Sequence, residues 1–231
     1  MLRITSVLCL LAFPLCAQEL IPLRSGNGTA GGTDANITVL QGPFAAPFTV
    51  AEYATAVASM PAEIIPSGSF GWGPTLSNDP AALWVSTAQA GTGPPSLYAM
   101  PFSVTTAVIT QATISINMHV DDFLGDVINW GIAVNAVPVP NTTTTAGATW
   151  VNEIGFSNLD ITGFVAAGAN YLYLYVNNTG VTGAGGIQFS ASNPRKNQTV
   201  PSKKPPPNLP RSKVETEYER QNQHRSVTLL L

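Results

Sequence analysis

Apolar and polar residues alternate along most of the chain between residues 37 and 194. The alternation is clearest over 112–120, where five apolar residues are separated by four polar ones. It recurs over 187–191 and over 171–176, where three aliphatic residues alternate with three tyrosines. Because successive side chains of a β-strand point to opposite faces of a sheet, this period of two predicts strands with one buried face.

Further segments have the β-branched and apolar composition of strands, and clusters of Gly, Pro and Asn between them predict turns. These segments are residues 48–58, 82–87, 98–108, 127–134 and 148–152. Because no stretch shows a sustained helical period with caps, we expect little helix. The pattern predicts an all-β protein, an antiparallel two-sheet β-sandwich of the jelly-roll type.

The two ends of the chain differ in composition from this region. Residues 1–17 combine Arg3 with an apolar stretch and a Leu-Cys-Ala triplet, as is typical of a secretory signal peptide. Residues 18–36 are rich in Gly and polar residues and predict a flexible lead-in, so the domain is expected over 37–194. Residues 195–231 form a Lys/Pro-rich run that predicts a disordered tail. We therefore expect a secreted, extracellular or cell-envelope protein with no transmembrane segment in the mature chain.

Charge is divided unevenly along the chain. No Lys or Arg lies between residues 25 and 194, which carry nine carboxylates, whereas residues 195–231 carry eight cations and three carboxylates. A domain without cations cannot neutralise phosphates, so we expect no nucleic acid among its partners. Both cysteines, Cys9 and Cys16, lie in the predicted leader, so the mature chain has no disulfide and no thiolate chemistry.

Gly26, Gly28 and Gly31 match the G-x-G-x-x-G pattern of dinucleotide-binding proteins. That motif functions between a strand and a helix, where its glycines bring helix amides to a pyrophosphate. Neither neighbour is predicted here. We therefore interpret these glycines as part of the flexible lead-in.

Several segments together resemble a known family: residues 78–87, 112–122, 127–129, 168–178 and 185–189. They are similar to the galactose-binding-like jelly-roll domains of secreted bacterial proteins, especially those with a PEP-CTERM sorting tail. In that family a tryptophan-bearing strand pairs late, an Asp-Asp pair ends a central strand, and Gly-x-Asn precedes a long apolar strand. The resemblance implies a fold like that of carbohydrate-binding modules and brings no catalytic motif. The chain departs from the family at its end, where the Lys/Pro-rich run replaces the sorting tail.

Aromatic residues supply the candidate ligand site. Tyr171, Tyr173 and Tyr175 are expected on one face of a strand, where an exposed row would form a platform for stacking on sugar rings. The alternative is that the strand is central and these tyrosines are buried. Trp72 stands between glycines in a predicted loop, so we expect it to be exposed and to add to the ligand site.

Asp121, Asp122 and Asp126 form the densest polar cluster, together with His119. Three carboxylates within six residues are suitable ligands for Ca²⁺, so one interpretation is a structural calcium site. The other interpretation is a solvated turn. We interpret His119 as an ordinary strand histidine rather than a catalytic base, because no G-x-S-x-G elbow accompanies it.

These observations together predict a secreted, non-catalytic β-sandwich module that binds carbohydrate or extracellular matrix. One alternative is a structural or adhesive envelope protein with no small ligand. A sandwich-fold hydrolase is the third, and it would require two carboxylates lining one cleft. No cofactor is assigned beyond the structural Ca²⁺ considered above.

Overall fold

The computed structural model describes residues 19–66, 68–88, 94–144, 149–179 and 185–192. The predicted signal peptide, residues 1–17, and the predicted basic tail, residues 195–231, lie outside the described residues. The chain divides into two units, 1–194 and 195–231, and all described residues belong to the first.

Strands dominate the described residues, with one α-helix, α1 (Val50–Val57), and one short 3₁₀ turn, η1 (Ser69–Gly71). The strands are β1 (Leu23–Arg24), β2 (Thr33–Gln41), β3 (Met60–Ile65), β4 (Trp84–Ser86), β5 (Ser96–Val104), β6 (Thr113–Asp121), β7 (Phe123–Leu124), β8 (Ile132–Val134), β9 (Val137–Pro138), β10 (Ile154–Asp160), β11 (Gly168–Asn177) and β12 (Gly186–Ser192). The all-β prediction is therefore confirmed. Within these residues no helix has the length and hydrophobicity needed to cross a membrane.

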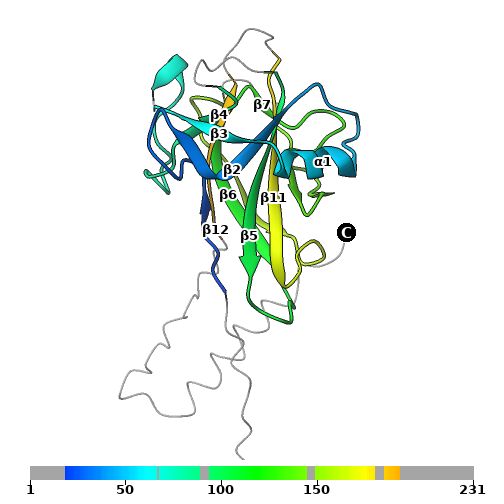
Figure 1. Ribbon diagram of the computed structural model, residues 1–231. Coiled ribbons are helices and arrows are strands. Elements are labelled where there is room, and N and C mark those ends of the chain that lie inside the picture. The colour runs from blue at the N-terminus through cyan, green and yellow to red at the C-terminus, as the bar shows by residue number, and fades with distance from the viewer. Residues whose placement is uncertain (1–18, 67, 89–93, 145–148, 180–184, 193–231) are drawn as a thin grey trace, which may run out of the picture. The chain divides into compact units, whose positions relative to one another are not determined.

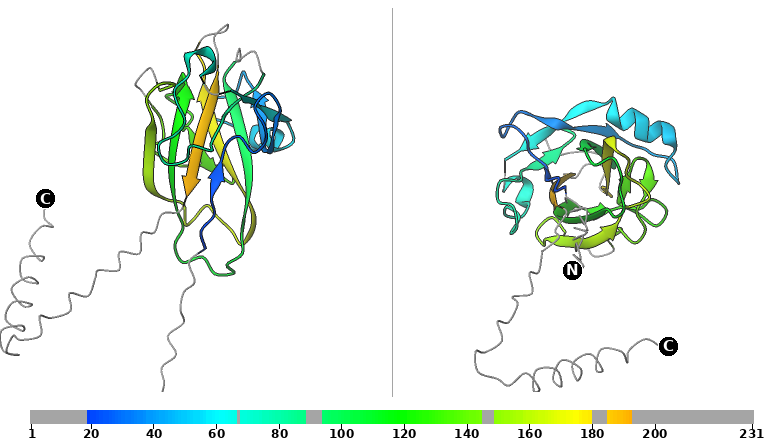
Figure 2. Two further views of the ribbon diagram at one scale, coloured as in Figure 1. Left: turned by 90° about the vertical axis from the view of Figure 1, so that its left-hand side faces the viewer. Right: turned by 90° about the horizontal axis from the view of Figure 1, so that it is seen from below.

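All strand pairs are antiparallel. Neighbouring strands follow one continuous order, β10-β6-β12-β4-β3-β2-β5-β11-β8-β9, with β1 beside β12 and β7 beside β11. The sheet curls as a half-barrel, and the view from below in Figure 2 shows it bending round the core. The division into two separate sheets that defines a sandwich is not confirmed.

The concave side of the sheet holds the main hydrophobic core. The alternating aliphatic residues of β6, β11 and β12 all lie in this core, as the period of two predicted. Ile116, Met118 and Val120 of β6 are each at most 1% exposed, and Leu172 and Leu174 of β11 are 1% exposed. Their polar and aromatic neighbours therefore point to the convex side, where the site residues lie.

The segment 48–58, predicted as a strand, is the helix α1, which lies on the convex side beside β2, β5 and β11 (Figure 1). The sequence contained a start signal for it. The Thr49 side chain accepts a hydrogen bond from the Glu52 backbone N–H, and the Glu52 side chain accepts one from the Thr49 backbone N–H, which is a capping box. Tyr53 and Ala56, three residues apart, are the buried positions of the helix. The prediction of a strand here was wrong because the helix is only two turns long and its period is brief.

Two other predicted strands differ from the structure. Only Ile132–Val134 of the segment 127–134 is a strand, because Asp126 turns the chain by accepting backbone hydrogen bonds at residues 128 and 129. The described residues of the segment 148–152 form a turn, and the strand follows as β10.

The segment 18–36 is part of the sheet rather than a separate lead-in. It contains β1, which pairs with β12, and the first residues of β2. Asp34, 2% exposed, accepts backbone hydrogen bonds at residues 26, 27, 36 and 37. The packed domain therefore begins before Ile37, and Gly26, the first glycine of the G-x-G-x-x-G match, donates to this carboxylate. A Cβ atom at Gly26, where φ is +88°, would lie 2.4 Å from Leu83 Cβ, so this close turn requires glycine.

Candidate functional site

The tyrosine row, which comprises Tyr171, Tyr173 and Tyr175 of β11, lies on the convex side of the sheet, but most of it is covered. Tyr173 and Tyr175 are each 5% exposed, and only Tyr171 is partly open to solvent. The Tyr53 ring of α1 lies 4.8 Å from the Tyr173 ring, and the Phe48 ring lies 4.9 Å from the Tyr175 ring, both edge-on. An exposed platform of three tyrosines is therefore a wrong prediction.

The cover over the tyrosine row comes mainly from α1, which lies in the segment 48–58 that was predicted as a strand. An eight-residue helix is not stable alone, so α1 needs an apolar surface to pack against. Tyr173 supplies part of that surface through its ring contact with Tyr53, and Phe48, just before the helix, packs on Tyr175. Burial raises the pKa of the Tyr173 and Tyr175 hydroxyls above the ordinary tyrosine range and that of Tyr53 to about 12, so all three are neutral.

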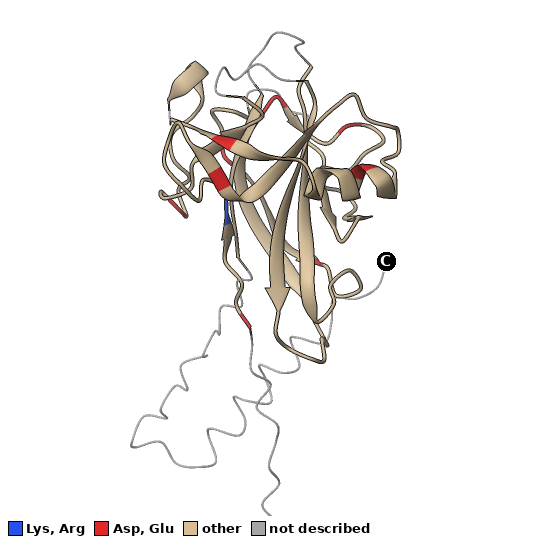
Figure 3. Ribbon diagram, in the orientation of Figure 1, with Lys and Arg blue, Asp and Glu red and all other residues tan. Residues whose placement is uncertain are grey.

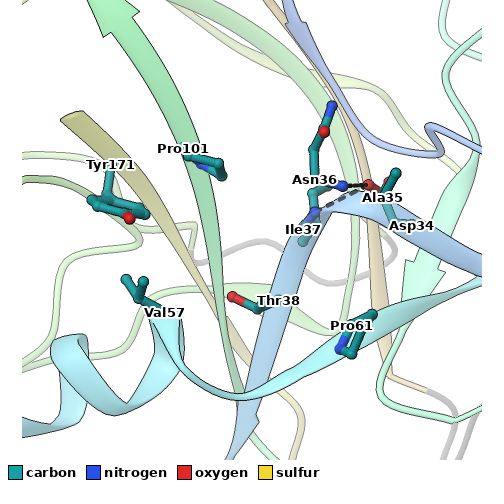
Figure 4. A pocket seen from close by; sticks show the side chains of 9 residues that line it. All are labelled: Asp34, Ala35, Asn36, Ile37, Thr38, Val57, Pro61, Pro101 and Tyr171. Atoms are coloured by element: carbon teal, nitrogen blue, oxygen red, sulfur yellow. Dashed lines mark hydrogen bonds between the residues drawn. The ribbon is translucent and has the colours of Figure 1, made fainter. Parts of the chain in front are cut away.

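The open end of the tyrosine row borders a shallow cavity of about 220 Å³, which we call the Tyr171 pocket. The residues lining it come from β2, α1, β3, β5 and β11, and Figure 4 shows their side chains. They are Asp34, Ala35, Asn36, Ile37, Thr38, Val57, Pro61, Pro101 and Tyr171. Its volume is below the roughly 300–1,000 Å³ of sites for drug-sized molecules, so the Tyr171 pocket suits a single ring or a short chain.

The Tyr171 pocket exists because β2 loses its sheet partners along part of its length. The register between β2 and β3 breaks between Thr33 and Thr38, and the pairing of β2 with β5 begins only at Thr38. Pro61 and Pro101, which have no backbone N–H, stand on the flanking strands at this place. The carboxylate of Asp34 accepts the backbone hydrogen bonds at residues 36 and 37 that a neighbouring strand would otherwise accept. The result is a depression with ordered walls.

The Tyr171 pocket is mainly apolar, and Asp34 adds one carboxylate to its wall. Tyr171, Pro101, Pro61 and Val57 offer ring and methyl surfaces, and the exposed Asn36 adds an amide with both donor and acceptor atoms. Arg24 is the only Lys or Arg in the part of the chain that the structure describes, and it does not line the Tyr171 pocket (Figure 3). Its Nη1 lies 3.6 Å from Asp79 Oδ1. These surfaces can stack on a ring and hydrogen-bond its hydroxyls, and they present no cation to an anionic group.

Trp72, the fourth predicted ligand residue, is buried at 4% exposure rather than exposed in a loop. Its ring is stacked on Trp84 with the centroids 4.3 Å apart, and its Nε1 donates to Asp121 Oδ2 at 2.6 Å. The flanking glycines let the chain turn this indole onto the sheet, with Gly71 at φ +74°. The prediction of a loop around Trp72 was correct, but the prediction that Trp72 is exposed was wrong, because the loop packs this side chain against Trp84.

The three aspartates of the predicted calcium site do not converge. Asp121 accepts from Trp72, Asp122 Oδ2 accepts from the Thr179 backbone N–H and hydroxyl, and Asp126 Oδ1 accepts backbone hydrogen bonds within its own turn. Across the described ranges no three His, Cys, Asp or Glu side chains are grouped so that they could hold a metal ion. The alternative of a turn held by hydrogen bonds describes Asp126 well, whereas Asp121 is a buried carboxyl group.

Asp121 and His119 have altered acid–base properties on the convex side of β6. Desolvation raises the pKa of Asp121 to about 7, the negative charge of Asp122 and a side-chain hydrogen bond with it add to the increase, and the Trp72 hydrogen bond opposes it. Desolvation lowers the pKa of His119, which is 2% exposed and stacks on Trp84. His119 Nδ1 has no hydrogen-bond partner, so this histidine is not oriented by a carboxylate as a catalytic base would be.

The lining of the Tyr171 pocket was missed by the sequence analysis, with Tyr171 the exception. Asn36, Pro61 and Pro101 come from three strands that are distant in the sequence, and no local pattern connects them. Asp34 left a weak signal, since an aspartate after a run of glycines is typical of a side chain that accepts backbone hydrogen bonds.

The fold and the pocket define an all-β protein with one curled antiparallel sheet and a small, mainly apolar depression on its convex side. No protein-family model matches the sequence, and no curated protein matches it either.

Proposed function

We propose that this protein is an exported, non-catalytic module that binds a neutral saccharide in the Tyr171 pocket. One sugar ring stacks on Tyr171 and the adjacent Pro101, and its hydroxyls hydrogen-bond to Asn36. Anionic sugars bind more weakly, because no cation lines the Tyr171 pocket and Asp34 places a carboxylate at its wall.

The observation that carries this proposal is the partial exposure of Tyr171 at the edge of an ordered depression. Tyr173 is covered by Tyr53 of α1 and Tyr175 by Phe48, whereas Tyr171 borders the cavity with Val57 (Figure 4). A tyrosine ring offers a flat apolar surface with a polar hydroxyl, which suits stacking on a sugar ring, and Asn36 lines the same cavity. Since the walls are held by Asp34, little conformational entropy is lost on binding.

Further support comes from the likeness to galactose-binding-like jelly rolls and from the leader over residues 1–17. We propose that the curled sheet is a variant of that two-sheet fold and that the protein is exported to the extracellular space or the cell envelope. The antiparallel, all-β architecture is compatible with this assignment.

Retention of the protein on insoluble and soluble polysaccharides tests the proposal, with neutral and uronic-acid polymers compared in the presence and absence of a calcium chelator. We expect retention on neutral polymers, unchanged by chelation. Tyr171→Ala should weaken binding by at least about tenfold, the equivalent of one stacking contact. Trp130→Ala is the matched control, because Trp130 is a 36% exposed aromatic residue that does not line the Tyr171 pocket. The absence of retention on every polymer, or equal retention of Tyr171→Ala, would overturn the proposal.

A second candidate function is adhesion without a small ligand. The turn after Asp126 presents Val127 at 100% exposure and Ile128 at 54%, beside Trp130. The buried Asn129 holds this turn by accepting from Phe48 N and donating to Ala45 O. Binding to cells or matrix that persists in Tyr171→Ala and is lost in a Val127→Ser/Ile128→Ser variant would favour adhesion. A hydrolase stays the third alternative, and the Tyr171 pocket contains one carboxylate rather than the pair that such an enzyme uses.

A further inference from the structure

Two polar side chains of the Tyr171 pocket already have partners within the protein. The carboxylate of Asp34 accepts hydrogen bonds from four backbone N–H groups, at donor–acceptor distances of 2.7–3.0 Å. A carboxylate has about four acceptor positions, so these bonds leave Asp34 little capacity for a ligand. The Thr38 hydroxyl donates to the Ala56 carbonyl at 2.7 Å, so its proton is not available to a ligand either.

The Asn36 amide and the Tyr171 hydroxyl are the polar side-chain groups of the pocket that remain for a ligand. Asn36 is exposed, and Tyr171 is half-buried. Within the described ranges, Asp34 accepts from the backbone N–H of Asn36, and no residue forms a hydrogen bond with the Asn36 side chain. The pocket can therefore satisfy only a small number of polar groups on a ligand.

Most of the remaining lining is apolar. Val57 is half-buried, Pro61 and Pro101 are exposed, and Figure 4 shows their side chains around the hollow. A plain hexose carries a hydroxyl group on nearly every carbon, and a hydroxyl placed against such a wall loses water without gaining a partner. A methyl group at the same position is favourable, because its contact with the wall removes apolar surface from water. The lining therefore favours a sugar that presents a methyl group to this wall.

We propose that the Tyr171 pocket recognises its sugar by a methyl group, which either a deoxyhexose with a terminal methyl group or an N-acetylhexosamine supplies. The sugar ring stacks on Tyr171 and Pro101, and one of its hydroxyls bonds to Asn36. The methyl group packs on Val57 and Pro61, the part of the apolar wall that the ring leaves free. This inference rests on the proposed function, because it names the class of sugar that the same site binds.

Competition by free sugars tests the proposal on the parent protein. The protein is bound to a neutral polysaccharide that retains it and is then eluted with glucose, with quinovose or with N-acetylglucosamine. Quinovose is glucose with a terminal methyl group, so the three sugars share one ring configuration and differ in a single substituent. We expect at least one methyl-bearing sugar to halve retention at a concentration at least about fivefold lower than glucose does. Galactose, D-fucose and N-acetylgalactosamine repeat the comparison for a second ring configuration.

Val57→Thr tests whether the apolar wall causes this preference. The substitution replaces one methyl group of the wall by a hydroxyl, so the advantage of the methyl-bearing sugar should fall to about twofold or less, while elution by the plain hexose changes little. Val50→Thr is the matched control, because Val50 lies on the same helix, is 77% exposed and does not line the Tyr171 pocket. Asn36→Leu should weaken binding of all the sugars alike, since it removes the hydrogen bond that they share.

The outcomes separate this inference from the proposed function. An advantage of one methyl-bearing sugar supports the inference and identifies which class supplies the methyl group. Equal competition by the plain and the methyl-bearing sugars in both series would overturn the inference and leave the saccharide site intact. The same advantage in Val57→Thr as in the parent protein would also overturn it, because the methyl group would then contact another surface. If no neutral polysaccharide retains the protein, both proposals fail.

Discussion

The convex side of the sheet has two covered regions that differ in their chemistry. Over β5 and β11 the cover is α1 together with the segment before it. The contact is aromatic and neutral, made by Tyr53 of α1 with Tyr173 and by Phe48, which precedes α1, with Tyr175. Over β12 and β6 the cover is the segment 68–77, whose Trp72 donates a hydrogen bond to the titratable Asp121. The comparison indicates that the first region buries only neutral aromatic rings, whereas the second also buries a carboxyl group, so pH should affect the stability of the second region more.

The largest expected effect concerns the helical cover. Tyr173→Ala removes a ring that α1 packs against, and it should lower the free energy of unfolding by about 3–5 kcal/mol, as for other large-to-small aromatic substitutions in a core. Urea denaturation at neutral pH measures this. Tyr171→Ala, at the open end of the same row, should cost less than half as much. Equal losses in the two variants would contradict the assignment of Tyr173 to the core and Tyr171 to the pocket edge.

The next effect concerns Asp121, which lies under Trp72, and the dependence of stability on pH. The pKa of Asp121 is about 7 in the folded protein, above its value in the unfolded chain, so the folded state holds the proton more tightly. The Asp121 contribution to stability is therefore full below about pH 4 and declines by an order of 2–4 kcal/mol as pH rises to 7. The difference in unfolding free energy between Asp121→Asn and the parent, measured from pH 4 to 8, should shift in favour of the variant as pH rises.

His119 provides the opposing test in the same region. Its pKa is lowered by burial, so its contribution to stability is present above about pH 6.5 and is lost as pH falls. His119→Gln should therefore gain stability relative to the parent on acidification. If the unfolding free energies of Asp121→Asn, His119→Gln and the parent changed with pH in parallel, neither group would have a pKa that differs between the folded and unfolded states.

The smallest effect concerns the start of α1. Thr49→Ala removes one half of the capping box and should cost about 1 kcal/mol of stability. Thr55→Ala is the matched control, because this exposed hydroxyl only donates to the Ala51 carbonyl within the helix. Its expected change is within about 0.5 kcal/mol. Circular dichroism during thermal unfolding of both variants distinguishes loss of the cap from a general effect of losing a threonine.

Local patterns were sufficient for the parts of the fold that rest on alternation. The strands around residues 112–120, 171–176 and 187–191 and their inward aliphatic faces follow from the period of two, because burial of one face imposes it. The same reasoning failed for α1, since a two-turn helix has too short a period to outweigh its valines, and the capping box was the signal that could have identified it.

The sequence by itself determined the all-β class, the aliphatic core faces and the absence of Lys and Arg from residues 25–194, because strand alternation and composition are local properties of the chain. Only the tertiary structure decided which tyrosine of β11 lines a pocket and that Trp72 is buried with its indole N–H donating to Asp121. It also decided that Asp121, Asp122 and Asp126 accept hydrogen bonds from different donors. The physical reason is that exposure depends on which distant segment packs over a face, and the alternation within a strand carries no information about its cover.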